Sequence, residues 1–339
     1  MFRQKKICFL ILLLFLSILL SGCLSSEKEK KISATRIYLD TVTTITLYGT
    51  EDEQILEDAF ALISRYQDIF SRTQTDSEVY RLNHSPDNTI PLSPPLAELV
   101  EKGLYYGKLT DGAFDLSIAP VSSLWNFTDE SPEVPVKSDI SSALSYVDYR
   151  NLQLCKNTLI RKNIHSQLDA GGIAKGYIAD KLKEFLLSKD ISSALINLGG
   201  NILCVGSKPD GTPFQIGIEK PFSNQGEMAA LLEVNDLSVV TSGTYERCFE
   251  KNGEFYHHIL DPSTGYPVKN NLQSVTIISS NSTDADALST SCFVLGLEKG
   301  LALINSISDT YAIFITEDNQ LHYSDGFSSH LKISELPSS

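Results

Sequence analysis

The sequence contains little cysteine for a protein of its length, with 6 cysteines among 339 residues. No two of them form a Cys-x-x-Cys pair, so the usual zinc-binding and dithiol redox motifs are absent. Two of the six lie near the N-terminus, and the other four are widely spaced, at Cys155, Cys204, Cys248 and Cys292. We expect these four to be buried free thiols, with two disulfides as the alternative.

Basic charge is also scarce, because 28 Lys and Arg residues face 42 Asp and Glu residues, which gives a formal net charge of −14. Such a surface is a poor match for nucleic acid or for anionic lipid. The segment 36–330 has no internal repeat and no linker rich in Pro, Gly or Ser. These absences favour one folded domain over a chain of modules.

Three common catalytic or nucleotide-binding motifs are missing. There is no Walker loop, no Gly-x-Gly-x-x-Gly and no Gly-x-Ser-x-Gly around Ser242. A P-loop enzyme, a Rossmann dinucleotide site and a serine hydrolase are therefore disfavoured.

The one long hydrophobic run is at the N-terminus. Arg3, Lys5 and Lys6 precede the apolar run 7–20, which ends in Leu20-Ser-Gly-Cys23. This layout is typical of a secretory signal peptide, predicted over 1–22. Its end resembles the bacterial lipobox, which implies cleavage before Cys23 and lipid on that sulfur. The alternative is a plain signal peptide with an unrelated cysteine.

Lipid chains would hold the protein at the membrane, since each buried CH₂ contributes about 0.8 kcal/mol. The polar residues 23–35 are predicted to form a tether, and the expected location is the extracytoplasmic face of the bacterial cell membrane. Removal of residues 1–22 takes three positive charges away and changes the net charge from −14 to −17. Lipid rather than surface charge would therefore hold the chain there.

Hydrophobic periodicity predicts an α+β fold over 36–330. The expected structure is a single domain with mixed or antiparallel sheets flanked by helices, and it is compatible with two lobes around a cleft. Helices are predicted at 55–70, 96–110, 173–188 and 285–295. Strands are predicted at 36–50, 194–205, 214–218, 231–240, 256–260, 275–279 and 311–316.

Two short stretches have residue types suited to phosphate or metal. The glycines of Asp169-Ala-Gly-Gly-Ile-Ala-Lys-Gly176 lie at the start of a predicted helix, where free N–H groups attract anions. A tight strand-to-helix turn is the alternative. On a helix Asp286 and Thr290 share one face with Ser289 beside them, and such oxygen ligands suit Mg²⁺. Spacing alone favours the other explanation, helix capping by Thr283 or Asp284.

Adjacent histidines precede a turn in His257-His-Ile-Leu-Asp-Pro-Ser-Thr-Gly-Tyr-Pro267. Neighbouring residues on a strand point to opposite faces. At most one of His257 and His258 can therefore serve a given site.

Six stretches, taken in order, resemble the ApbE family of FAD:protein FMN transferases, many of which are bacterial lipoproteins. The resemblance spans about residues 36–325, and the ordered set is specific although each stretch alone is weak. The stretches are Thr110-Asp-Gly-Ala-Phe-Asp115, Asp169-Ala-Gly-Gly-Ile-Ala-Lys-Gly176, Asn197-Leu-Gly-Gly200, Val240-Thr-Ser-Gly243, His258-Ile-Leu-Asp-Pro-Ser-Thr-Gly-Tyr-Pro267 and Asp286-Ala-Leu-Ser-Thr290.

The resemblance implies a reaction and a set of site residues. Members bind FAD and Mg²⁺ and move FMN onto a Ser or Thr hydroxyl of a partner flavoprotein, releasing AMP. The implied metal ligands are Asp286, Thr290 and the Gly172 carbonyl, with Ser289 beside them. The implied flavin contacts are Asn83, Ala113, Phe114, Asp115, Asp169, Lys175 and Ile259. Many members have Met-Gly-Thr where this chain has Asp40-Thr41-Val42, so the resemblance does not support a flavin contact at Asp40.

Within that motif His258 is the expected general base, with Asp261 orienting or assisting it, while His257 is expected to point away. An electron-transfer flavoprotein outside the cytoplasm is the expected acceptor. Two other functions stay open at this point. Water in place of the acceptor hydroxyl would make an FAD pyrophosphatase that yields FMN and AMP. A solute-binding lipoprotein, which usually has two similar lobes, is the alternative from a different class.

Overall fold

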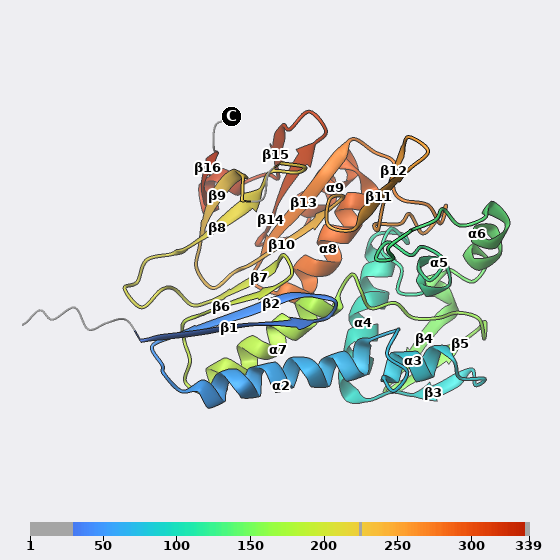
Figure 1. Cartoon of the computed structure of the whole chain (residues 1–339), viewed down its shortest axis with the longest axis horizontal. Helices are drawn as coiled ribbons and strands as arrows, with labels where there is room; N and C mark the ends of the chain where they lie inside the picture. The colour runs from blue at the N-terminus through green and yellow to red at the C-terminus, as the bar shows by residue number, and fades with distance from the viewer. Residues whose placement is uncertain (1–29, 224–225, 336–339) are drawn as a thin grey trace, which may run out of the picture.

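A computed structural model describes residues 30–223 and 226–335 (Figure 1). Its centre is an eight-stranded sheet in the order β1-β2-β6-β7-β10-β13-β14-β15, and every neighbouring pair is antiparallel. The α+β class is confirmed. The strands of this sheet are β1 (Lys31–Tyr38), β2 (Thr41–Tyr48), β6 (Ala194–Leu198), β7 (Asn201–Val205), β10 (Ser238–Gly243), β13 (Leu272–Ser279), β14 (Thr310–Thr316) and β15 (Leu321–Tyr323).

The central sheet is buried on both faces, and neighbouring residues of one strand belong to different cores. In β13, Ile277 packs in the larger core and Ile278 in the smaller one. Along β14, Ile313 is in the smaller core while Ala312 and Phe314 are in the larger one. This is the two-residue period of a strand. It explains why β14 is a nearly continuous apolar run from Tyr311 to Ile315.

Helices cover one face of the sheet and a small sheet covers the other. The larger core lies beneath the helices and the smaller core beneath the small sheet. The helices on the sheet are α2 (Glu53–Phe70), α7 (Ala174–Ser188), α8 (Ser282–Leu295) and α9 (Leu297–Asn305). The small sheet has the order β16-β9-β8, from β16 (Lys332–Glu335), β9 (Met228–Val234) and β8 (Phe214–Glu219), with α10 (Phe327–His330) before β16.

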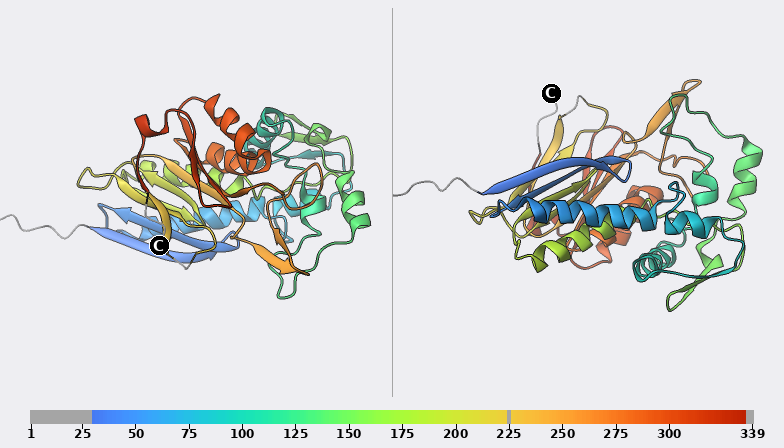
Figure 2. Two further views of the ribbon diagram at one scale, coloured as in Figure 1. Left: turned by 90° about the horizontal axis from the view of Figure 1, so that it is seen from above. Right: turned by 60° about the horizontal axis from the view of Figure 1, so that its bottom comes forward.

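A second part of the fold, residues 71–168, lies at one end of the sheet (Figures 1 and 2). It contains a three-stranded sheet in the order β3-β5-β4, the long helix α4 and several short helices. Its elements are α3 (Glu78–Asn83), β3 (Thr89–Pro91), α4 (Pro94–Leu109), α5 (Ala119–Ser122), α6 (Lys137–Leu144), η1 (Tyr149–Asn151), β4 (Leu152–Cys155) and β5 (Thr158–Arg161).

An isolated hairpin joins the two parts. Its strands are β11 (Cys248–Lys251) and β12 (Glu254–His257). Phe249 and Tyr256 of the hairpin pack against Trp125 and Phe127 of the second part, with ring centroids 5.6 to 5.7 Å apart across the contact. Lys251 also forms an ion pair with Glu133 at 2.7 Å. The hairpin is therefore fixed to the residues that follow α5.

The predicted helices are all present, but three of the predicted strands are each two strands. Two of these pairs, β1–β2 and β6–β7, are hairpins, whereas β9 and β10 belong to different sheets. Residues 36–50, 194–205 and 231–240 each contain a turn, at Leu39-Asp40, Gly199-Gly200 and Asn235-Asp236. Gly199 and Gly200 both have positive φ, 62° and 88°, which suits a two-residue hairpin turn. Apolar content continues across each turn, so the hydrophobic pattern alone did not reveal it.

The limits of the folded part also differ from the prediction. Strand β1 begins at Lys31, inside the predicted 23–35 tether, because residues 31–38 pair with β2 along their whole length. At the other end β16 pairs with β9 beyond residue 330. The signal peptide, the lipidation at Cys23 and most of the tether lie outside the described residues. Within the described ranges, each helix is either too short or too polar to span a lipid bilayer.

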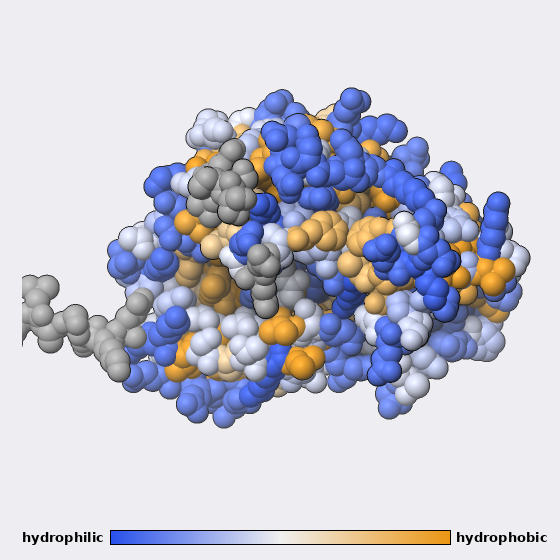
Figure 3. Space-filling view, turned by 45° about the horizontal axis from the view of Figure 1, so that its top comes forward, coloured by the Kyte–Doolittle hydropathy of each residue, from blue (hydrophilic) through white to orange (hydrophobic). Residues whose placement is uncertain are grey.

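The four cysteines beyond the N-terminus are free thiols, as predicted. Cys204 and Cys292 are buried, and burial raises the pKa of both thiols. Burial was wrongly predicted for Cys155, which is exposed at the end of β4, and Cys248 is half-buried. Hydrophilic side chains cover most of the face drawn in Figure 3, in keeping with the acidic composition.

Candidate active site

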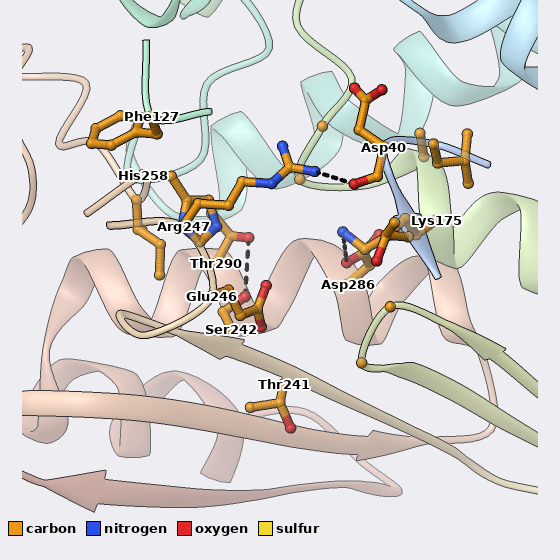
Figure 4. Close-up of a pocket in the computed structure, with 18 of the residues that line it drawn as sticks. Asp40, Phe127, Lys175, Thr241, Ser242, Glu246, Arg247, His258, Asp286 and Thr290 are labelled. Carbon is orange, nitrogen blue, oxygen red and sulfur yellow. Dashed lines mark hydrogen bonds and ion pairs between the residues drawn. The ribbon is translucent and has the colours of Figure 1, made fainter. Parts of the chain in front are cut away.

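A cavity of about 1460 Å³ lies where the two parts of the fold meet. Its walls come from the β1–β2 turn, the start of α7, the end of β10, the α8 helix and residues 113–128. Pockets for drug-sized ligands usually measure about 300 to 1,000 Å³, so this one has room for a dinucleotide. Figure 4 shows the side chains that point into it.

Helices α7 and α8 hold each other at the floor of the cavity. The Asp286 carboxylate of α8 accepts a hydrogen bond from the Gly176 N–H in the first turn of α7, at 2.8 Å. In return Asp180 of α7 accepts the N–H groups of Ser282 and Thr283, both at 2.8 Å. Carboxylates suit the positive end of a helix and its free N–H groups. A Cβ on Gly176 would lie 2.2 Å from the Ser282 carbonyl oxygen, so glycine permits this close approach.

The capping explanation for residues 283 and 284 is not correct. Asn281 is the N-cap of α8 and accepts the Asp284 N–H. The Thr283 hydroxyl donates to Asp180, and the Asp284 carboxylate pairs with Lys102 at 2.9 Å on the outer side.

Three of the predicted metal ligands line the cavity together: Gly172, Asp286 and Thr290. Gly172 is next to Thr290, since a Cβ there would be 3.4 Å from the Thr290 Oγ1. One carboxylate oxygen of Asp286 is used by Gly176, and the other lies 4.0 Å from the Lys175 ammonium. A carboxylate, a hydroxyl and a backbone carbonyl are a donor set that Mg²⁺ accepts. The residues present therefore fit this ion.

Ser289 occupies a different position from the one predicted. It is fully buried and does not line the cavity. Its hydroxyl donates to the Asp286 carbonyl at 2.8 Å, and Ser242 shares a second 2.8 Å hydrogen bond with it. Ser242 in turn lies 3.5 Å from the Thr290 hydroxyl. Ser289 thus fixes the end of β10 against α8, behind the cavity wall.

The two histidines separate as their strand positions predict. His258 lines the cavity, and its Nδ1 is buried without a hydrogen-bond partner in the described part of the chain. His257 is outside the cavity lining, contacts the Val268 carbonyl through Nε2 at 3.0 Å and packs edge-on against Phe293. Burial, with the nearby charges of Arg247 and Lys175, lowers the pKa of His258 to about 3. Its ring is therefore neutral near pH 7.

Asp261 does not contact His258. Its carboxylate accepts the N–H and the hydroxyl of Ser263, at 2.8 and 2.7 Å, in a side-chain turn. It does not line the cavity. The Asp-Pro-Ser-Thr-Gly sequence explains this, because an aspartate that starts a turn bonds to the backbone two residues later. The expected orienting role of Asp261 has no support in this geometry.

The predicted flavin contacts divide into wall residues and supporting residues. Ala113, Phe114, Asp115, Asp169, Lys175 and Ile259 line the cavity, whereas Asn83 does not. Asn83 is buried and makes two hydrogen bonds to the backbone of Leu168, at 2.7 and 2.9 Å. It holds the segment that leads into Asp169 and therefore supports the cavity from behind.

Most of the carboxylate oxygens on this wall already have protein partners. Asp115 accepts the Ser117 N–H and hydroxyl and the Tyr149 N–H, and burial raises its pKa. Asp169 accepts the Ser122 hydroxyl at 2.7 Å and forms an ion pair with Arg72 at 3.1 Å. These contacts fix the wall, and they leave Asp169 half-buried beside the cavity.

Comparison with known proteins decides the family. The ApbE family model matches residues 39–315, which is most of the chain. The chain belongs to the ApbE family.

Several relatives of this ApbE chain cover most of its length. An FAD:protein FMN transferase of Klebsiella pneumoniae (strain 342) is 38% identical over 280 residues, covering 82% of this chain and 86% of that protein. One from Treponema pallidum (strain Nichols) is 32% identical over 332 residues, covering 92% of each. Among solved structures, the ApbE protein of Thermotoga maritima superposes with a TM-score of 0.82 at 30% identity, covering 88% of this chain and 99% of that chain.

This ApbE chain also has cavity residues that the sequence patterns did not single out. Glu246 and Arg247 follow the Val240-Thr-Ser-Gly243 motif and line the cavity. Desolvation raises the pKa of Glu246 to about 7, although its side chain is exposed at the cavity. Asp40 is also in the wall, and its carbonyl accepts from the Arg247 guanidinium at 3.2 Å. Glu246 and Arg247 come shortly after a strand that ends in glycine. This position is the one sequence signal that could have identified them as cavity residues.

Proposed function

We propose that this chain transfers FMN from FAD to a Ser or Thr hydroxyl of an acceptor protein and releases AMP. It is an FAD:protein FMN transferase, the name shared by relatives that are 30–38% identical to it over most of its length. The proposal rests on one observation. A single cavity, large enough for a dinucleotide, is lined by His258, Lys175, Asp286 and Thr290.

Negative charge on the diphosphate is the first obstacle to this reaction. Mg²⁺ held by Asp286, Thr290 and the Gly172 carbonyl would neutralise charge on the phosphate oxygens. The Lys175 ammonium is beside Asp286 and adds a fixed positive charge in the same place. Helix α8 supplies two of these groups one turn apart, and its packing on α7 keeps them in place.

The acceptor hydroxyl is a weak nucleophile and needs a base. His258 is neutral near pH 7 because burial and nearby cations disfavour its charged form. In the proposed step the hydroxyl proton passes to His258 while the hydroxyl oxygen forms a bond to the FMN-side phosphorus. The bond from that phosphorus to the bridging oxygen breaks, and AMP leaves with that oxygen. The proton on His258 then returns to solvent.

Two further proposals rest on the sequence. The acceptor is expected to be another chain, an electron-transfer flavoprotein outside the cytoplasm. The protein itself is expected to be held by lipid on Cys23 at the extracytoplasmic face of the membrane. Palmitate labelling of the full-length protein, compared with Cys23→Ala, tests the anchor, and loss of label in the variant is the expected result.

The other two functions make different predictions. A solute-binding lipoprotein would have two similar lobes, whereas here an eight-stranded sheet and a small three-stranded sheet form unlike parts. A pyrophosphatase would release FMN and AMP from FAD with no acceptor present. Incubation of the domain with FAD and Mg²⁺, with and without an acceptor flavoprotein, separates hydrolysis from transfer.

A further inference from the structure

Three cationic side chains line the cavity within the described residues: Arg72, Lys175 and Arg247. Arg72 forms an ion pair with Asp169 at 3.1 Å, and Lys175 is 4.0 Å from Asp286. Arg247 has no carboxylate within 4.0 Å in that part of the chain. Its guanidinium donates one hydrogen bond, to the Asp40 carbonyl oxygen at 3.2 Å.

The backbone places Arg247 beside the proposed base. Its carbonyl oxygen accepts the His258 N–H at 3.0 Å, so the two residues are directly linked. Figure 4 shows its side chain extending from the His258 side of the cavity toward Asp40. The charges of Arg247 and Lys175 both act on His258 and on Glu246. Two cations therefore converge on one region of the cavity.

A guanidinium has five N–H donors, and one neutral carbonyl leaves most of them unused. Its planar fork matches two oxygens of a phosphate group, and charge-assisted bonds to phosphate are stronger than bonds to a neutral carbonyl. A diphosphate ester in this cavity would thus compete well with the Asp40 carbonyl for Arg247.

We infer that Arg247 binds the diphosphate of the dinucleotide substrate, exchanging its bond to the Asp40 carbonyl for bonds to phosphate oxygens. This inference rests on the proposed function and adds a residue to it. The competing role is structural, with Arg247 only tying the β1–β2 turn to the start of the β11–β12 hairpin. A structural tie would affect all ligands of the cavity alike, whereas a phosphate contact affects only those that carry phosphate.

The test compares flavins with and without a diphosphate. FAD and riboflavin are titrated by calorimetry into the wild-type domain and into Arg247→Ala and Arg247→Lys, without Mg²⁺ or acceptor. A hydrogen bond to a charged group contributes about 1.5 to 3 kcal/mol, so Arg247→Ala should weaken FAD binding by about 10- to 100-fold. Riboflavin affinity should change by less than about twofold, and Arg247→Lys should give an intermediate loss for FAD.

Arg81→Ala is the matched control, because Arg81 is exposed on α3 and also donates to a backbone carbonyl, that of Asp76, outside the cavity lining. It should leave both affinities unchanged. Equal weakening of FAD and riboflavin in Arg247→Ala, or no weakening of FAD, would overturn the inference.

A second pair of probes keeps the two proposals separate. ADP and adenosine are titrated into the same variants, and Arg247→Ala should weaken only ADP. If the wild type binds neither FAD nor riboflavin, the proposed function fails, while ADP against adenosine still tests whether Arg247 holds phosphate. If the wild type transfers FMN and Arg247→Ala binds ADP as tightly as wild type, only the inference about Arg247 fails.

Discussion

Asp286 and Gly176 are joined by a 2.8 Å hydrogen bond from the glycine N–H to the aspartate carboxylate. One oxygen of Asp286 thereby caps helix α7, while the other is directed toward Lys175. Asp180 makes the reverse contact, from α7 to the first turn of α8. The floor of the cavity is therefore built by two helices that cap each other, and the candidate metal ligand is also a structural residue.

Replacement of Asp286 should separate its two roles. Asp286→Asn retains a side-chain oxygen that can accept the Gly176 N–H, but it removes the negative charge that Mg²⁺ needs. Loss of a group that supports a metal ligand usually lowers metal affinity or activity by about 10- to 100-fold. Loss of a direct ligand should lower turnover by at least about 100-fold. Folding should change little.

The measurement is the rate of transfer at increasing Mg²⁺, with thermal unfolding as the control. Asp286→Ala should show the same loss of turnover and a lower melting temperature as well. Wild-type turnover in Asp286→Asn at low Mg²⁺ would contradict the ligand role.

The two adjacent histidines should respond in opposite ways. His258→Ala removes the candidate base and should lower turnover by about 100- to 10,000-fold with little change in stability. His257→Ala removes a buried hydrogen bond and packing against Phe293, and should lower the free energy of unfolding by about 2 to 4 kcal/mol. Single-turnover transfer and denaturant unfolding of both variants measure this. The reverse pattern would assign the base to His257.

Stability should depend on pH through His258. Its pKa is about 3 in the folded protein and near 6.5 when unfolded, so the unfolded chain binds more protons between these values. The free energy of unfolding should therefore fall as the pH decreases from about 6.5 toward 3. His257 has a lowered pKa for the same reason, burial, and contributes in the same direction. His258→Gln should make the slope shallower, and an unchanged slope would mean that His258 is not buried in its neutral form.

Arg161 is the largest fully buried side chain of the described residues, and its hydrogen bonds go to backbone oxygens. Its guanidinium donates to four carbonyls, those of Leu82, Ser85, Asp87 and Ser166, at 2.6 to 3.3 Å. Arg161→Met should leave these oxygens unpaired and lower the free energy of unfolding by about 3 to 5 kcal/mol. Arg150→Met, at an exposed salt bridge, should change the free energy of unfolding far less. Similar unfolding curves for the two variants would contradict this.

Much of the fold could be predicted from periodicity, and the missing parts have a common cause. The long helices α2, α4, α7 and α8 have buried apolar residues, and α2, α4 and α8 also begin at a capping side chain, so their predicted positions are close to those observed. The pattern does not separate β6 from β7, which form a hairpin, or β9 from β10, which belong to different sheets, because both strands of each pair are largely buried and apolar. The hydrophobic pattern reports burial, and it does not report a change of direction between two buried strands.

The sequence motifs correctly predicted several residues that line the cavity. They did not distinguish these from residues that support the cavity wall from behind. Lys175, Asp286, Thr290 and His258 all line the cavity, as expected from their motifs. Ser289 and Asp261 are in the same motifs and Asn83 lies outside them, yet all three bond to backbone or hydroxyl groups behind the wall. Their partners are brought close only by folding, so a linear pattern cannot separate the two kinds of residue.

Mass spectrometry of the acceptor tests the transfer itself most directly. The protein without residues 1–22 is incubated with FAD and Mg²⁺, with and without a Thr-bearing flavoprotein, and AMP and FMN are quantified in parallel. We predict that the acceptor gains the mass of one FMN, that AMP is released in equal amount, and that both disappear with His258→Ala. Release of FMN and AMP at the same rate without acceptor, with no mass gain, would contradict a transferase and indicate hydrolysis.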